Sequence, residues 1–204
     1  MIVERSGIRP SVAPGARVAP SAQVVGDVRI EEGCVIDHGA VVASSGAPVA
    51  IGAGSVVMAN AVIRSVGGAH RPAHPVEIGE EVLVGPLAAL AGCTIEDAAY
   101  IATGVIVFHG VVVGRGSRLG AGSIAHVGAR LPAGSRLGMR QYAVAQEAGD
   151  ALITADLDEA RRLIARADFF GQVFERSDDD LETLHRATVA TLRAEAEAWS
   201  DLEG

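Results

Sequence analysis

Apolar residues recur at every sixth position through the middle of the chain. Ile78, Val84 and Leu90 begin the series, and after one step of five it resumes with Ile95, Ile101, Val107, Val113 and Leu119. Strands alternate with period two and helices repeat about every 3.6 residues, so neither explains a step of six. Such a step is typical of the hexapeptide coils of a β-solenoid. The pattern therefore predicts a mainly β protein, a parallel β-helix with further inward residues at Val25, Ile51, Leu131 and Leu137.

The stacking of coils also explains the composition of this part of the chain. Each aliphatic residue is expected to point into the prism and to pack on its equivalent in the next coil, while Gly and Ala permit tight corners. A narrow prism has little room for rings, and the aromatic residues before residue 150 are only Tyr100, Phe108 and Tyr142. One interruption, Ser65–Pro75, should leave the prism as a loop, and such loops often carry function.

Past residue 150 the pattern becomes helical. Thr154 or Asp156 is suited to cap a first helix that runs through Ala167, and Ser177 to begin a second that runs to about Trp199. The second helix has one modest apolar stripe. We therefore divide the chain into a β-helix, residues 1–149, and a C-terminal appendage of α-helices, residues 150–204.

The net charge of −8 follows the same division. Residues 1–149 contain 11 Arg and 11 Asp or Glu, whereas residues 150–204 contain 6 Arg and 14 Asp or Glu, so the appendage carries the whole excess. All 17 basic residues are Arg, which excludes mechanisms that need a lysine. A neutral body with an acidic tail argues against nucleic acid as a partner.

Neither a membrane partner nor export is expected. No apolar run approaches the ~18 residues of a membrane span, and the N-terminus lacks a signal pattern. The sequence therefore favours a cytoplasmic protein. In a reducing compartment Cys34 and Cys93 are expected to be buried thiols, and Cys93 to be an inward stack member rather than a nucleophile.

The segment Val76–Gly114 reads VEIGEEVLVGPLAALAGCTIEDAAYIATGVIVFHGVVVG. It is similar to the γ-class carbonic anhydrase family, in which an Ile-Gly coil is followed by Gly-His, His-Gly-Cys and Ile-Gly-Asp. Upstream, Ala43-Ser44-Ser45 stands at the family's Arg-Gly-Asp, and Val56–Arg64 at its stretch ending in Val-Ile-His. The resemblance covers roughly residues 10–140. It implies a left-handed β-helix that assembles as a homotrimer.

The resemblance also shows which chemistry is missing. The three positions of the family's zinc histidines are Arg64, Pro86 and Ala91, and none of these side chains can bind zinc. Supporting polar groups are lost as well, with Met58 and Ala59 at the Gln-Asp pair. Hydration of carbon dioxide by a zinc hydroxide is therefore excluded, and we expect neither a metal nor another cofactor.

Four of the six histidines are candidates for a site elsewhere. His70 and His74 are on the insertion, and His109 lies about one coil beyond Ala91, with His126 one further coil along. They are either scattered residues with local hydrogen bonds or the remains of a new cluster.

In the family the metal lies between subunits, so the equivalent cleft here is more apolar and holds one fixed cation. Arg64 is suited to bind a carboxylate or phosphate. We expect a small anionic or carbonyl ligand on Arg64, with His70, His74 or His109 as acid or base, Asn60 as an orienting amide, and Tyr100 and Phe108 as walls. The alternative is that Arg64 pairs with an acid of a neighbouring subunit.

Three classes of function remain open. The first is a repurposed, metal-independent enzyme or binding protein for such a ligand, and the second is a non-catalytic structural subunit of an assembly. The third is a hexapeptide-repeat acyltransferase that uses acyl-CoA, with His109 or His126 as the base. Several arginines are spaced by multiples of six and could line one edge for the phosphates of CoA; the series is Arg115, Arg118, Arg130 and Arg136.

Overall fold

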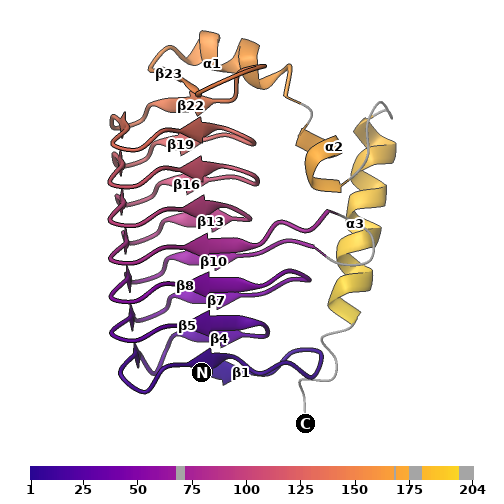
Figure 1. The fold of residues 1–204 in the computed structure, drawn as a ribbon. Coiled ribbons are helices and arrows are strands. Elements are labelled where there is room, and N and C mark those ends of the chain that lie inside the picture. Colours follow the sequence, from indigo (N-terminus) through magenta and orange to yellow (C-terminus); the bar gives the residue numbers. More distant parts are fainter. Residues whose placement is uncertain (68–71, 168, 175–180, 198–204) are drawn as a thin grey trace.

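A computed structural model of the chain describes residues 1–67, 72–167, 169–174 and 181–197. In it the chain winds into a parallel β-helix whose coils stack from the N-terminal end upward (Figure 1). Each coil gives one short strand to each of three sheets, and residues 18 positions apart, such as Ile101 and Leu119, are neighbours in one sheet. The predicted mainly β fold of hexapeptide coils with C-terminal helices is confirmed.

Three sheets form the walls of the prism. Sheet 1 contains β1 (Ile2–Val3), β4 (Gln23–Val25), β7 (Val41–Ala43), β10 (Val62–Arg64), β13 (Ala89–Ala91), β16 (Ile106–Val107), β19 (Ile124–Ala125), β22 (Tyr142–Val144) and β23 (Leu152–Thr154). Sheet 2 contains β2 (Ser11–Val12), β5 (Val28–Ile30), β8 (Val49–Ile51), β11 (Val76–Ile78), β14 (Thr94–Ile95), β17 (Val112–Val113) and β20 (Arg130–Leu131). Sheet 3 contains β3 (Arg17–Val18), β6 (Val35–Ile36), β9 (Val56–Val57), β12 (Leu83–Val84), β15 (Tyr100–Ile101), β18 (Arg118–Leu119) and β21 (Arg136–Leu137).

The inward residues of these strands make one continuous core. The predicted series from Ile78 to Leu119 is buried throughout, and so are Ile51, Leu131 and Leu137. Burying one such side chain contributes about 1.5–3 kcal/mol, so the stacked column is the main source of stability. One predicted position is wrong by a residue: Val24, which pairs with Val42, points into the core in place of Val25.

The corners of the prism set the rest of the composition. At most corners of the described coils one residue has a positive φ, as at Gly116 (φ 67) and, one coil earlier, Ala98 (φ 55). A left-handed backbone costs an L residue roughly 1–2 kcal/mol, which explains why glycine is common at this place in the repeat.

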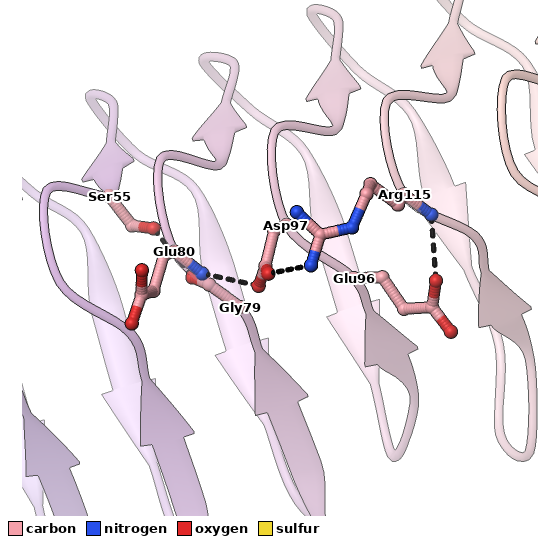
Figure 2. A network of polar contacts seen from close by, with 6 residues as sticks. All are labelled: Ser55, Gly79, Glu80, Glu96, Asp97 and Arg115. Carbon is pink, nitrogen blue, oxygen red and sulfur yellow. Dashed lines mark hydrogen bonds and ion pairs between the residues drawn. The ribbon is translucent and has the colours of Figure 1, made fainter.

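Polar side chains join successive coils at the corner between sheets 2 and 3 (Figure 2). Asp97 accepts a hydrogen bond from the Glu80 amide at 2.8 Å and forms an ion pair with Arg115 at 2.5 Å. The Arg115 amide in turn donates to Glu96 at 2.8 Å. These acids therefore satisfy turn amides that no strand would pair, which is a structural role. Arg115 of the predicted arginine edge belongs to this network.

The C-terminal region begins with a strand. β23 pairs antiparallel with β22, whereas the sequence predicted helix from about residue 154. Asp156 then caps α1 (Leu157–Ile164) by accepting from two backbone amides, as predicted, but this helix ends before Ala167. The strand forms because an open edge of sheet 1 remains after β22, and pairing with it satisfies the backbone of residues 152–154.

Two more helices follow, α2 (Phe169–Phe174) and α3 (Leu181–Glu197). The sequence did not predict α2, and the predicted ends of the second helix, Ser177 and Trp199, lie outside the described residues. Figure 1 shows α2 and α3 (orange and yellow) beside the edge of the prism where the long loops emerge. None of the helices described is long and apolar enough to cross a membrane.

Candidate functional site

The corner between sheets 1 and 2, here called the 1–2 corner, is the irregular corner of the prism. Successive inward residues across it are separated by nine positions from Val42 to Ile51, by fifteen from Ile63 to Ile78, and by five after Leu90. Extra residues cannot enter a filled prism, so they leave it as loops, and the predicted insertion is the longest of these. This corner is therefore where the scaffold carries chemically varied side chains.

Successive coils align four residues in a column at this corner. Arg64 pairs with Ala91, and the backbone bonds of Phe108 and His126 continue the register through the next two coils. Neighbouring coils lie about 4.8 Å apart, so residues far apart in the sequence become close neighbours. Residues that are 17 or 18 positions apart in the sequence, such as Phe108 and His126, therefore lie next to each other in the column.

Aromatic and imidazole rings pack together along the column. The ring centroids of His74 and His109 are 5.4 Å apart, and those of Phe108 and His126 are 5.3 Å apart. Phe169 of α2 packs edge-on against Phe108 at 6.0 Å and lies 6.3 Å from His109. We call His74, Phe108, His109 and His126 the histidine corner.

Two of these imidazoles are almost buried, with His109 8% and His126 9% exposed. Burial lowers the pKa of His126, because a charged imidazolium loses hydration there. The ring is therefore neutral at pH 7 and offers a basic nitrogen. Its Nδ1 is buried and accepts or donates no hydrogen bond among the described residues, which leaves Nε2 as the nitrogen for a substrate.

The base of the insertion positions His74. The backbones of His74 and Val66 exchange two hydrogen bonds, of 2.5 and 3.0 Å, which close the loop at its root. His74 then lies against Gly92, where a Cβ would stand 2.5 Å from the His74 Cβ and 3.1 Å from His109 Cδ2. The absence of a side chain at Gly92 therefore lets the two imidazoles meet.

Arg64 lies lower in the same column and is half-buried. Its Nε donates to Ser45 Oγ at 3.2 Å, and it forms no ion pair with any residue that the structure describes. The cation expected in the cleft is therefore available to an anion within one chain.

Other predicted residues lie elsewhere. Asn60 and Pro86 are on the corner between sheets 3 and 1, at the opposite edge of sheet 1 from Arg64. Tyr100 is exposed on sheet 3. The structure thus brings together His74, Phe108 and His109, and separates them from Asn60 and Tyr100. His70 lies outside the described residues.

Tyr100 belongs to a groove of about 650 Å³ on the outer face of sheet 3. Arg118 and Arg136 are neighbours in register above Tyr100, and Gln141 also lines the groove. Both arginines are exposed and form no ion pair within the described part of the chain. Two of the four arginines considered in the sequence therefore do line one edge, whereas Arg130 lies on sheet 2.

A second hollow, of about 820 Å³, lies between the last coils and α1. Its walls include Val127 and Gly128, which follow His126 directly, and Arg166 beyond α1. This pocket opens beside the histidine corner.

The zinc positions do not fit a metal. Arg64, Pro86 and Ala91 include no ligand, and no group of three His, Cys, Asp or Glu side chains among residues 1–67, 72–167, 169–174 and 181–197 could hold one. Burial raises the pKa of Cys93 to about 12, so this thiol is not a thiolate at neutral pH. We therefore derive no metal or thiolate chemistry from this corner.

Comparison with solved structures places the fold. A proposed acetyltransferase of Bacillus cereus superposes with a TM-score of 0.57 and 22% identity over 81% of this chain and 89% of its own. A hexapeptide transferase family protein of Anaplasma phagocytophilum gives 0.50 and 20% identity over 97% of this chain and 96% of its own. No protein-family model and no curated protein matches the sequence. The chain has the left-handed β-helix fold of hexapeptide-repeat proteins, and the finer likeness to γ-class carbonic anhydrases stays a prediction.

Proposed function

We propose that the protein is a hexapeptide-repeat acyltransferase that transfers an acyl group from an acyl-CoA thioester. One observation carries this proposal: His126 is a neutral, nearly buried imidazole packed on Phe108, and the two residues that follow it line an open pocket. A base of this kind is what attack on a thioester needs at neutral pH. The two structures of similar fold, both described as transferases, support the same class.

The reaction follows from this placement. His126 Nε2 takes the proton from an acceptor hydroxyl or amine as its oxygen or nitrogen bonds to the thioester carbonyl carbon. The tetrahedral oxyanion then collapses, the carbon–sulfur bond breaks, and the imidazolium returns the proton to the departing CoA thiolate. The chain's own role is to hold a neutral base in a place from which much of the water is excluded.

The groove on sheet 3 is suited to the phosphates of CoA. Arg118 and Arg136 present two guanidinium groups on adjacent coils, and guanidinium binds phosphate in bidentate fashion. Sheet 3 and the 1–2 corner face different sides of the prism, so an acyl-CoA in the groove would meet the histidines of a neighbouring copy. The proposal therefore includes the homotrimer expected from the sequence.

Sheet 1 supports such an assembly. Its outer face carries an aliphatic column in which Val62 is 42% and Ile106 36% exposed, with Ala89 between them. A flat row of this kind is stabilised when a second copy covers it.

A second candidate is favoured by Arg64. A relative of the γ-class carbonic anhydrases without zinc would bind a small anionic or carbonyl compound at the cleft between subunits, with or without chemistry. The guanidinium of Arg64, which no described carboxylate neutralises, is the observation in its favour.

Thiol release from acetyl-CoA and longer acyl-CoAs, measured with a panel of amine and hydroxyl acceptors, tests the main proposal. We expect His126→Asn to lower kcat/KM by about 10²–10⁴, which is the usual contribution of a general base. His38→Asn is the matched control, because His38 is exposed and its ring bonds to Ser21 Oγ at 2.9 Å and to no other residue that the structure describes. Equal turnover by wild type and His126→Asn would refute the assignment, and ligand binding without turnover would favour the second candidate.

A further inference from the structure

Leu87 has an unusual backbone for a large apolar residue. It lies on the corner between sheets 3 and 1, here called the 3–1 corner, and has a φ of +59. Backbone hydrogen bonds align it with Gly104 and Gly122 of the next coils, which have the same left-handed backbone. This backbone is unfavourable for any residue with a Cβ, and the leucine side chain has no polar group that could bond locally in return. The side chain is nevertheless 62% exposed, so burial within one chain does little to offset the strain.

The three corners of the prism differ in charge. Four successive turns of the 3–1 corner, residues 58–61, 85–88, 102–105 and 120–123, contain no charged residue. The corner between sheets 2 and 3 carries the acids and the arginine of Figure 2. The 1–2 corner carries the loops and the histidines, and α2 and α3 lie beside it, across sheet 1 from the 3–1 corner (Figure 1). The 3–1 corner is therefore an exposed edge without charge, which is typical of the core of an interface.

Apolar side chains flank Leu87 on both adjoining sheets. The outward positions of its own coil and of the two neighbouring coils are Val56, Leu83 and Tyr100 on sheet 3 and Val62, Ala89 and Ile106 on sheet 1. Sheet 2 differs, because Glu77 and Thr94 are among its outward residues in the same coils. One apolar surface thus continues around the 3–1 corner, and surfaces of this kind mark sites of association.

We propose that the 3–1 corner lies at the three-fold axis of a homotrimer, with sheet 3 of each copy packed against sheet 1 of the next. The occupant of the apolar surface is a second copy, because the two faces that would cover each other belong to one chain and meet at one edge. A contact between two different faces closes into a ring around a three-fold axis. The three Leu87 side chains then meet at one level on the axis, and their burial offsets the strained backbone.

This packing also completes the proposed active site, a step that rests on the proposed acyltransferase function. The groove of about 650 Å³ on sheet 3 is lined by described residues that include Arg118 and Arg136 but no histidine. The histidine corner lies at the edge of sheet 1 remote from the 3–1 corner. When sheet 1 of one copy covers sheet 3 of the next, the histidines of the first stand at the outer side of the groove of the second. Each active site takes its arginines from one copy and its histidines from another.

The state of assembly tests the corner without any acyl donor. Leu87→Asn should keep the fold, because Asn60 has the same backbone one coil earlier, with a φ of +58. We expect sedimentation over a range of concentrations to show that the midpoint of trimer dissociation is at least about tenfold higher in this variant. Glu81→Asn is the matched control, since Glu81 has a φ of +54 in the same coil but on the corner between sheets 2 and 3. It should leave the midpoint within about twofold.

Cross-linking gives an independent measurement of the same contact. Because both native cysteines are buried, a short bismaleimide should join copies of Leu87→Cys in pairs and leave copies of Glu81→Cys single. Circular dichroism checks that each variant is folded. A monomeric wild type, a trimer that is as tight in Leu87→Asn, or cross-linking of Glu81→Cys as efficient as that of Leu87→Cys would overturn the proposal.

Co-expression of two impaired variants tests the shared site. His126→Asn keeps the groove, whereas the double variant Arg118→Gln/Arg136→Gln keeps the histidines. Mixed trimers should regain about a quarter of wild-type acyl transfer at low acyl-CoA, because one interface in about four joins an intact groove to an intact histidine corner. No recovery with an active wild type would refute the pairing of sheets 3 and 1. A wild type without acyl transfer would refute only the proposed function, and cross-linking would still decide which corner lies at the axis.

Discussion

His74 lies against the bare α-carbon of Gly92, and a Cβ at residue 92 would stand 2.5 Å from the Cβ of His74. Gly92 also has a φ of +53, so its backbone is already in the left-handed region. The meeting of the His74 and His109 rings depends on this one missing methyl group. The turn between Leu90 and Ile95 is tight because these inward residues are five positions apart and not six.

Gly92→Ala should therefore destabilise the protein and displace His74. The left-handed backbone costs alanine roughly 1–2 kcal/mol, and the overlap with His74 adds a further loss of about 1–3 kcal/mol. Gly104→Ala is the matched control, since Gly104 has a φ of +65 and nothing within 4 Å of its would-be Cβ. Urea unfolding of both variants separates the two costs, and equal losses would contradict the packing described.

The lowered pKa of His126 makes stability depend on pH. The unfolded chain takes up a proton at the ordinary histidine pKa of about 6.5, whereas the folded chain does so only at lower pH. Between these two values the unfolded state holds more protons, so the free energy of unfolding falls as pH drops below about 6.5 and recovers above it.

His126→Gln should remove part of this dependence, because glutamine does not titrate. Urea unfolding at pH 7.5 and 5.5 measures the difference between variant and wild type. His38→Gln serves as the control, because His38 is exposed and does not belong to the histidine corner. If the free energy of unfolding of the wild type falls no more between pH 7.5 and 5.5 than that of His126→Gln, the result would contradict the burial of a neutral imidazole.

Both cysteines should be inert in the folded protein. Cys34 and Cys93 are buried, and burial raises the pKa of each thiol, that of Cys93 to about 12. Because the thiolate is the reactive form, Ellman's reagent should find no thiol before unfolding and both afterwards. Rapid modification of the native protein, or loss of acyl transfer in Cys93→Ala at unchanged stability, would contradict a purely structural role.

The sequence predicted the core of the fold well because a filled prism leaves little freedom. Each inward residue packs on its equivalents, so a step of six can be read directly from the chain, as from Ile95 to Leu119. The error at Val25 arose where two adjacent valines fit the pattern equally. The strand at residues 152–154 was missed because the edge that it covers exists only in three dimensions.

The site was harder to predict, since it depends on which residues share a corner. His74 and His109 were named from the sequence, but their contact follows from the insertion returning exactly above Gly92, which spacing alone does not show. Asn60 and Arg64 are close in sequence, yet sheet 1 lies between them.

Neutralising the groove on sheet 3 should weaken CoA binding. Arg118→Gln and Arg136→Gln each remove one guanidinium from a groove that holds no described carboxylate, and we expect the Kd for CoA to rise about tenfold in each. Calorimetric titration checks this expectation, and the expected weakening should be larger at low salt. Arg130→Gln removes the same charge from another face and should change the Kd for CoA little. If it raised the Kd as much as Arg118→Gln or Arg136→Gln, the effect would be long-range attraction and not binding in the groove.

Assembly of the protein should depend on the aliphatic column of sheet 1. Ile106 lies between Ala89 and Ile124 on the outer face of that sheet and is 36% exposed in the single chain. An arginine there would place an unpaired charge in the proposed interface, a cost of several kcal/mol that should dissociate the trimer. Val112→Arg makes the same change on sheet 2, between Thr94 and Arg130, where the neighbours are polar. Light scattering should report a trimer for wild type and Val112→Arg and smaller species for Ile106→Arg; a monomeric wild type would remove the shared site from the proposed mechanism.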